Sequence, residues 1–318
     1  MTDDGIAGQM RRAATTLLKQ LDDDQLALAH LPFSDDAARR WLEYRPEPRP
    51  GACLATLTLG GRKAAHRLLA TALSDRAFAQ AMAIVALEEV LDRREKGALQ
   101  RHIGDYWVAV FGDPAGDEPW SWRFEGHHVS VTMTMLGAAV SPAPVFFGAN
   151  PARVSYAGRT VSRPLAPEED LGWALLDALG TRGRAVAIVA DEAPADILTA
   201  TRPRARPELS PLGVAAASLG PTPRALLAGL VALYLDRLVP ELAGREADRI
   251  AGGELYFAWA GSASPGTPHY YRVQGDDLLI EYDNTQDHSN HAHTVLRRPR
   301  SDFGDDILAA HYGAAHVA

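Results

Sequence analysis

The spacing of apolar residues along the chain predicts two blocks of helices, each followed by a block of strands. Apolar residues recur every three or four positions over the expected helices, which span 9–30, 35–45, 61–74, 76–97, 167–179, 181–190, 193–200, 221–237, 239–251 and 302–314. They alternate with polar residues over the expected antiparallel strands, which span 106–112, 120–126, 127–135, 140–148, 255–260, 269–275, 278–284 and 291–297. This order predicts an α+β fold.

The two strand blocks also resemble each other, which predicts a tandem duplication. Residues 107–132 align with residues 256–281 without a gap, and the shared residues fall at turn-forming glycines and prolines and at one arginine. Upstream, LLKQL at 17–21 resembles LLDAL at 175–179. We therefore expect two repeats of a helices-then-hairpins unit, 1–155 and 165–318, related by a pseudo-twofold axis.

Composition and charge narrow the class of protein. Hydrophobic residues make up 47 % and charged residues 23 % of the 318 positions, which is typical of a globular protein. The net charge of −8 is spread without a long run of one sign, which argues against a nucleic-acid partner. No stretch approaches the 18 or so apolar residues of a membrane span. The sequence leaves the oligomeric state open.

The single cysteine, Cys53, excludes an internal disulfide and a cysteine-based zinc site. The first residues, MTDDGIAGQMRRAATTLLKQ, lack the basic-then-apolar order of a signal peptide. These two observations predict a cytoplasmic protein.

The stretch from Glu281 to Arg297 is the strongest candidate for a chemical site. It reads EYDNTQDHSNHAHTVLR: a strand ending in carboxylates, a polar loop, and a strand that begins with two histidines. Alternate side chains of a strand share a face about 6.5–7 Å apart, so His291 and His293 can reach one metal ion, and Glu281 and Asp283 also share a face. A solvated loop with a surface HxH motif is the alternative.

A second pair of histidines, His127 and His128, falls near an expected hairpin tip at Gly126. Neighbouring residues of a strand point to opposite faces, so only one of the two would join a given site, although the geometry is freer at a tip. With His291 and His293 it would complete three histidines, a usual set for a catalytic metal. A histidine that is merely hydrogen-bonded is an equal alternative.

Two further side chains, Tyr271 and Arg272, are expected opposite the Glu281 strand, where they could bind an anionic substrate or orient a carboxylate. The alternative is an aromatic-packed hairpin with a solvated arginine.

Other acidic residues are interpreted as structural. Asp191 or Asp196 is expected to cap the helix at 193–200, and Glu88 and Glu89 to lie on the exposed face of the helix at 76–97. The chain has no GxSxG, HExxH, GxxxxGK[ST] or GxGxxG motif, which argues against the common hydrolase, zincin, P-loop and dinucleotide-binding classes.

Six motifs taken together resemble one family. In order they are PWSWRFEGHHVS at 119–130, FFGANP at 146–151, DEAPADIL at 191–198, PHYYRVQG at 268–275, EYDNTQ at 281–286 and NHAH at 290–293. From about residue 15 onward the chain resembles the bacterial domain-of-unknown-function family 3500. Members of that family often resemble exported proteins with a leader, unlike the expectation here. The resemblance implies no established activity.

The residues therefore carry the functional hypotheses. The leading one is a metal-dependent enzyme acting on a small organic substrate, with His127 or His128, His291 and His293 as ligands of Fe, Cu, Mn or Zn. Nitrogen ligands beside many tyrosines and tryptophans favour an iron or copper oxidoreductase. A zinc hydrolase with Glu281 or Asp283 as general base is the second hypothesis. A non-catalytic small-molecule or metal-binding protein is the third.

Overall fold

The computed structural model describes residues 5–99, 101–205 and 211–309. The α-helices are α1 (Ile6–Leu18), α2 (Asp23–Ala29), α3 (Asp36–Arg39), α4 (Leu59–Ala70), α5 (Asp75–Arg94), α6 (Ala166–Ala178), α7 (Gly180–Ala187), α8 (Pro221–Leu235) and α9 (Pro240–Ile250). Single 3-10 turns are η1 (Leu54–Thr56), η2 (Ala216–Ser218), η3 (Asp287–Ser289) and η4 (Asp302–Gly304). The expectation of an α+β fold is confirmed.

The strands form one mixed sheet and a small separate hairpin. The sheet contains β1 (His30–Leu31), β2 (Ala52–Cys53), β3 (Tyr106–Phe111), β4 (Trp120–Gly126), β5 (Val129–Leu136), β6 (Ala139–Ser141), β7 (Val145–Ala149), β10 (Ile188–Ala190), β11 (Val214–Ala215), β12 (Tyr256–Gly261), β13 (His269–Gln274), β14 (Leu279–Gln286) and β15 (His291–Arg297). The hairpin pairs β8 (Val154–Tyr156) with β9 (Arg159–Ser162).

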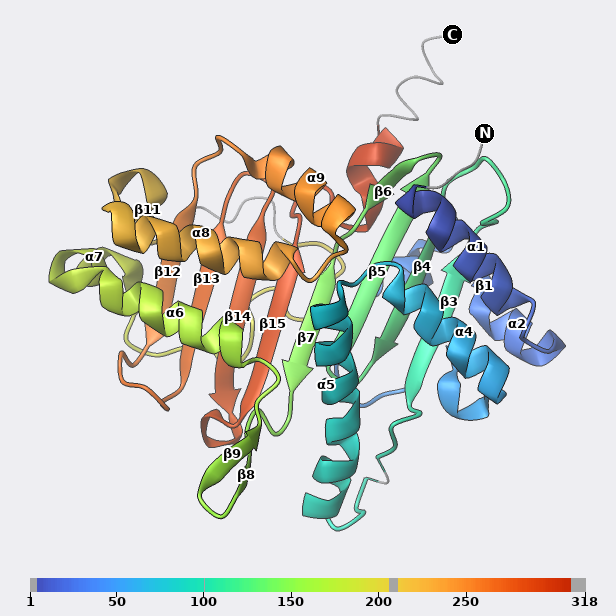
Figure 1. Cartoon of the computed structure of the whole chain (residues 1–318), viewed down its shortest axis with the longest axis horizontal. Coiled ribbons are helices and arrows are strands. Elements are labelled where there is room, and N and C mark those ends of the chain that lie inside the picture. Colours follow the sequence, from blue (N-terminus) through green and yellow to red (C-terminus); the bar gives the residue numbers. More distant parts are fainter. Residues whose placement is uncertain (1–4, 100, 206–210, 310–318) are drawn as a thin grey trace, which may run out of the picture.

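The order of strands across the sheet is β1-β3-β4-β5-β7-β15-β14-β13-β12-β10. At each end a short strand pairs in parallel with its neighbour, β1 with β3 and β10 with β12, and the other pairs are antiparallel. β7 and β15 pair in the middle, so the strands of the first half of the chain meet those of the second half there (Figure 1).

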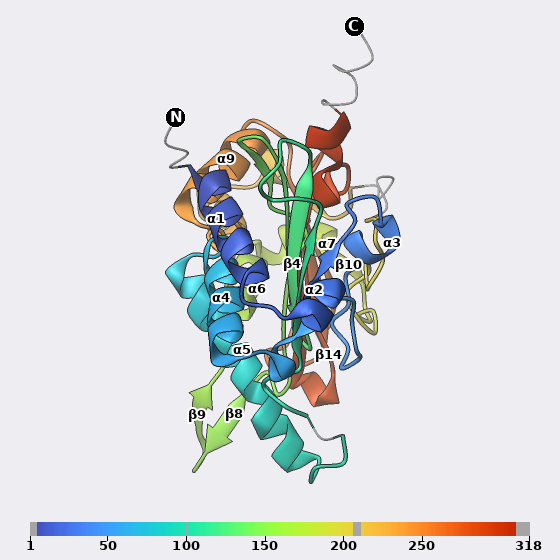
Figure 2. The ribbon, with the colours of Figure 1, turned by 90° about the vertical axis from the view of Figure 1, so that its right-hand side faces the viewer.

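Long helices cover one face of this sheet and irregular segments cover the other (Figure 2). The helices α1, α4, α5, α6, α8 and α9 lie on the first face, above the main hydrophobic core. On the second face, residues 30–51 and 191–205 pack on the strands, for example through Tyr44 on Phe146 and Ile197 beside Val295. No helix of the described ranges is both long and apolar enough to span a membrane.

Because both faces are covered, the polar residues of the strands are buried rather than solvated. β4 and β13 are buried along their whole length, although each alternates apolar and polar residues. Arg123 donates hydrogen bonds to the carbonyl oxygens of Ala38 and Pro50, and Glu125 accepts from Ser130 Oγ at 2.6 Å. These partners offset the cost of burying the charges.

Most of the expected strands are confirmed, and several expected helices are wrong, shorter or divided; the helix expected at 9–30 is α1 and α2, and the one expected at 61–74 ends at Ala70. The strand expected at 140–148 is two strands, β6 and β7, since Pro142 and Pro144 have no N–H to donate. Residues 193–200 are not helical and form bends and one turn, and α3 covers only four residues of the helix expected at 35–45. The helix expected at 181–190 ends at Ala187, and the next three residues form β10. Residues 305–309 are helical, and the rest of the helix expected at 302–314 lies outside the described residues.

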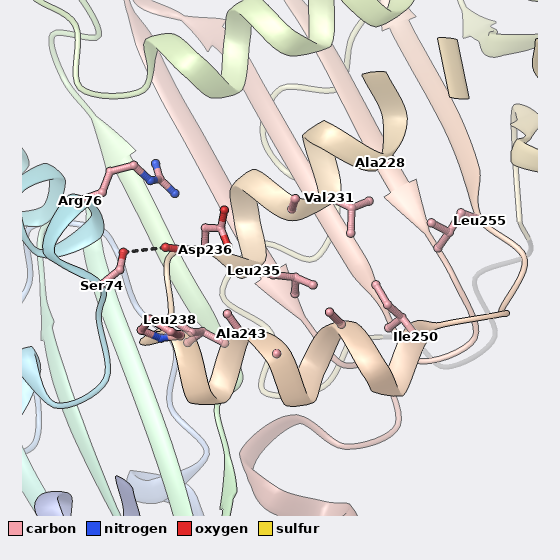
Figure 3. A pocket seen from close by; sticks show the side chains of 14 residues that line it. Ser74, Arg76, Ala228, Val231, Leu235, Asp236, Leu238, Ala243, Ile250 and Leu255 are labelled. Carbon is pink, nitrogen blue, oxygen red and sulfur yellow. Dashed lines mark hydrogen bonds between the residues drawn. The ribbon is translucent and has the colours of Figure 1, made fainter. Parts of the chain in front are cut away.

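The helical layer has its own contact in the middle of the molecule, between the α4–α5 turn and the α8–α9 turn. Ser74 N–H donates to the carbonyl oxygen of Arg237 at 3.0 Å, and Val239 N–H donates to that of Ala72 at 2.9 Å. Ser74 Oγ also donates to the carbonyl oxygen of Asp236 (Figure 3). Beside this contact lies an apolar cavity of about 690 Å³ between α8 and α9; none of the histidines lines it.

Candidate metal centre

Three histidines from both halves of the chain meet at one end of β7 and β15. β4 and β5 are joined by a two-residue turn, because Gly126 pairs with Val129, and His127 and His128 form that turn. His128 has a φ of 67°, a left-handed conformation that is unusual for a residue other than glycine, and its N–H donates to Tyr44 O. His291 and His293 begin β15 and share a face, as expected from their spacing.

The ring nitrogens of these histidines converge. His128 Nε2 lies 2.8 Å from His291 Nε2 and 3.2 Å from His293 Nε2. Ligand atoms of the three residues all lie within 4.8 Å of one another. A tetrahedral ion about 2.0–2.1 Å from each nitrogen would hold the nitrogens about 3.3 Å apart. The two distances from His128 Nε2 are therefore close to the spacing of ligands to a single ion, and the third pair lies within 4.8 Å.

The other ring nitrogens of the β15 histidines have partners suited to metal ligation. His293 Nδ1 donates to Asp196 Oδ1 at 2.7 Å, and Tyr44 Oη donates to Asp196 Oδ2 at 2.8 Å. Asn150 lies 3.4 Å from His291 Nδ1, and its Oδ1 atom is buried without a hydrogen-bond partner among the described residues. Turning this amide would let Oδ1 accept a hydrogen bond from the Nδ1–H group of His291, leaving Nε2 free for an ion.

Gly148 in β7 makes room for the cluster. A Cβ atom at this position would lie 2.6 Å from His128 Cδ2, closer than carbon atoms approach in proteins, and 3.0 Å from His293 Cδ2, which is also tight. Its N–H donates to His128 O at 2.7 Å, which fixes the hairpin tip against β7. The two rings can approach each other because this residue has no side chain.

Burial keeps the imidazoles neutral. The pKa of His291 falls to about 3 because the ring is buried and His293 is close, and burial with the neighbouring His127 lowers the pKa of His128 well below its usual value. Burial is the largest single influence on Asp196 and opposes its ionisation, but the hydrogen bonds from His293, Tyr44 and Ile197 N–H and the nearby His293 ring together lower the pKa of that carboxyl. Neutral imidazoles beside an ionised carboxylate are the protonation states that metal binding requires.

The fourth histidine belongs to an adjoining group. The ring of His127 lies 3.7 Å from that of His128, centroid to centroid, and its Nδ1 is hydrogen-bonded to Glu88. Glu88, His127 and His128 also have ligand atoms within 4.8 Å of one another. Glu88 is 4 % exposed, so the expectation that it lies on the solvent face of its helix is wrong. It points inward because α5 passes over β5 and β7.

The carboxylate expected in the site at Glu281 has other partners. Glu281 accepts hydrogen bonds from Leu198 N at 2.6 Å, Thr199 N at 3.2 Å and Tyr270 Oη at 2.8 Å. It therefore anchors residues 197–199 to the second face of the sheet. Asp196, which directly precedes these residues, is the carboxylate that contacts His293.

Asp283 shares its sheet face with His293, its partner across the β14–β15 pair. Its Oδ1 accepts from Thr285, and its Oδ2 is buried without a hydrogen-bond partner among the described residues. Burial raises the pKa of this carboxyl to about 7. Asp283 is not among the residues whose ligand atoms cluster with the three histidines.

Tyr271 and Arg272 are not both directed at the histidines. Tyr271 lies on the helix side of the sheet, where its hydroxyl donates to Glu168 O at 2.9 Å and lies 2.9 Å from Tyr234 Oη. Arg272 lies on the second face, paired across the strands with Glu281, and is 3 % exposed. Adjacent strand residues point to opposite faces, so these two could not serve one site.

Glu88 and Asp196 were missed as site residues for a physical reason. Each is more than 30 residues from the histidine it contacts, and the sequence shows no spacing that links them. A ligating histidine commonly donates its second N–H to a carboxylate, so an acidic residue was to be expected here. The DEAPADIL motif contained it, although its expected helix does not form.

We expect Asp196→Asn to weaken metal binding by about 10- to 100-fold while leaving the fold intact. The amide carries no charge and stabilises the His293 Nδ1–H tautomer less well. Metal affinity measured by competition with a chelator would show the change. The control is Asp191→Asn, an exposed acid of the same segment, and equal affinities for the two variants would contradict the role given to Asp196.

The fold and the site together define an α+β protein with buried histidine and glutamate groups able to bind a metal ion. The chain belongs to the family described as protein of unknown function (DUF3500), whose family model matches residues 4–305. No curated protein matches the chain. No solved structure matches it either.

Proposed function

We propose that the protein is a metal-dependent enzyme whose ion is held by His128, His291 and His293. The observation that carries the proposal is the convergence of the three Nε2 atoms from two separate parts of the chain. Two facing imidazole nitrogens can share only one proton, so mutual hydrogen bonds cannot satisfy all three rings. One ion can. The unpartnered Asn150 Oδ1 supports the same arrangement.

The donor set narrows the choice of metal. Three imidazoles suit zinc, copper and iron, whereas manganese and magnesium prefer oxygen ligands. Three protein ligands also leave a coordination position open, as in catalytic zinc sites. Zinc, copper and iron are therefore the expected metals, and manganese is the least favoured of the four that the sequence suggested.

A specific observation favours a zinc hydrolase. A bound zinc ion would activate water for attack on a small organic substrate. Beside the three ligands, His127 is paired with Glu88, an arrangement in which a carboxylate orients an imidazole and supports its action as a general base. His127 and Glu88 thus replace Glu281 and Asp283 as the proposed proton-transfer residues.

The iron or copper oxidoreductase remains a second candidate because of Tyr44. The ring of Tyr44 lies 4.7 Å from that of His293 and its hydroxyl is bound to Asp196. A phenol in contact with a metal ligand can exchange an electron with a redox metal. A redox reaction would use this residue, whereas hydrolysis would not.

Metal analysis of protein purified without a histidine tag tests the proposal. We expect about one equivalent of metal per chain. Zinc would favour the hydrolase, and iron or copper the oxidoreductase. Protein that contains no metal and takes up none of the three on dialysis would refute the metal-dependent function and leave a binding protein without metal.

We also infer that the chain is a tandem duplication with a pseudo-twofold axis. Three things support it: Ala109 pairs with Arg123 as Ala258 pairs with Arg272, the strand order is the same from both edges, and the Ser74–Arg237 and Val239–Ala72 bonds are reciprocal. An experimental structure in which 106–149 does not superpose on 255–297 would contradict it. The boundaries 1–155 and 165–318 and the cytoplasmic location stay predictions.

A further inference from the structure

A polar cavity of about 350 Å³ lies beside the metal centre, between the end of α5, β8 and η3. The polar residues that line it include Arg94, Arg153, Arg163, His288, Ser289 and Asn290. They come from both halves of the chain.

The cavity carries positive charge that is not neutralised within it. Glu169 also lines the cavity, and it pairs with Arg163, as does Asp170, so the charge of Arg163 is offset. Arg94 and Arg153 have no acidic group within 4 Å among the residues that the structure describes, and both are exposed. Ser289 Oγ is buried and has no hydrogen-bond partner in the same part of the chain. Two free guanidinium groups and a free hydroxyl can all donate to one anion.

The cavity is joined to the metal centre through Asn290. Asn290 O accepts from Ala152 N at 2.7 Å, and Asn290 Oδ1 accepts from Arg153 N at 2.8 Å. The next residue is His291, the least buried of the three ligands. A molecule whose anionic group sat in the cavity would therefore lie next to the side from which solvent reaches the cluster.

We propose that this cavity binds the anionic group of the substrate, a phosphate or a carboxylate. The assignment of that anion to a substrate rests on the proposed metal-dependent function. Arginine suits this task because its planar guanidinium matches both groups and stays charged at any physiological pH. Arg94 and Arg153 bind the anion, and Ser289 Oγ donates to one of its oxygens.

Calorimetric titration with inorganic phosphate and, separately, with succinate tests the proposal. Both titrations use metal-free and metal-loaded full-length protein, because an anion could also bind the ion itself. We expect saturable binding of one of the two anions to the metal-free protein, with about one equivalent per chain. Stronger binding of phosphate would identify a phosphate group, and stronger binding of succinate a carboxylate.

Arg94→Gln and Arg153→Gln should each weaken that binding about tenfold or more, as expected for loss of a hydrogen bond to a charged group. The control is Arg182→Gln, which removes the same charge from an exposed position on α7 outside the cavity, and its affinity should not change. The proposal is overturned if neither anion binds the metal-free protein, or if all three variants bind alike.

The same samples separate this proposal from that of the metal. The two cavity variants should keep the metal content of the unaltered protein, because neither arginine is a ligand. A protein without metal whose cavity still binds the anion would refute the enzyme proposal, and with it the assignment of the anion to a substrate, but would leave the cavity as an anion-binding site. A protein that contains metal, but whose affinity for the anion is unchanged by Arg94→Gln and Arg153→Gln, would refute the cavity proposal alone.

Discussion

Alanine at His293 should reduce the metal content of the purified protein to background. His293 contributes a converging Nε2 atom, and its Nδ1 links the site to Asp196. Loss of an outer partner alone costs about 10- to 100-fold in affinity, so loss of a ligand should cost more than about 100-fold. His128→Ala and His291→Ala should have effects of the same size, measured by metal analysis and by chelator competition.

The fold should survive these substitutions. The main hydrophobic core lies on the helix side of the sheet and does not include the three histidines, so removing one imidazole leaves that core unchanged. Circular dichroism and the unfolding midpoint would show this. His30→Ala is the matched control, because His30 is an exposed histidine at the sheet edge. A His293→Ala protein with a full equivalent of metal would exclude the site.

The histidine cluster was predictable where the sequence periodicity fixes which face a residue takes. His291 and His293 share a face because residues two apart in a strand always do. The position of His128 at a hairpin tip followed from the period-2 pattern on both sides of Gly126. The approach of the two halves was an expectation from their likeness, and the β7–β15 pairing is what brings His128 to His293.

The carboxylates were not predictable because the covering segments carry no periodic signal. Alternation along β13 and β14 indicates which residues share a face, but it does not distinguish solvent from a covering loop. Residues 191–205 supply that cover, and they bury Glu281 and bring Asp196 to His293. Glu88 failed for a related reason. A helix that packs on a sheet, as α5 does, buries more of its surface than the positions of its apolar residues indicate.

Replacement of Arg237 by methionine should destabilise the protein by about 3–5 kcal/mol, as expected when one partner of a buried ion pair is removed. Arg237 and Glu168 are both 0 % exposed, and the guanidinium donates to Glu168 Oε1 at 3.0 Å and to Thr294 Oγ1 at 2.7 Å. Without Arg237 the carboxylate of Glu168 keeps, among the described residues, Gln80 as its one side-chain donor. Denaturant unfolding would measure the loss of stability.

This pair joins elements from across the molecule, which is why the effect should be large. Glu168 lies in the first turn of α6 and Arg237 follows α8. Thr294 lies in β15, which pairs with β7 from the first half of the chain. Arg245→Met on α9 is the matched control. Its pair with Glu241 is about half exposed, so its loss should change stability by less than about 1 kcal/mol.

A second substitution distinguishes two causes of the expected instability: the unpaired buried charge of Glu168 and the lost packing of the Arg237 side chain. The double variant Arg237→Met with Glu168→Gln buries no unpaired charge, so it should be more stable than Arg237→Met alone. Arg237 also lies over the rings of Tyr234 and Phe147, and the methionine side chain retains part of that contact. If the double variant were as unstable as the sum of the two single variants, the pair would contribute through packing and not through charge.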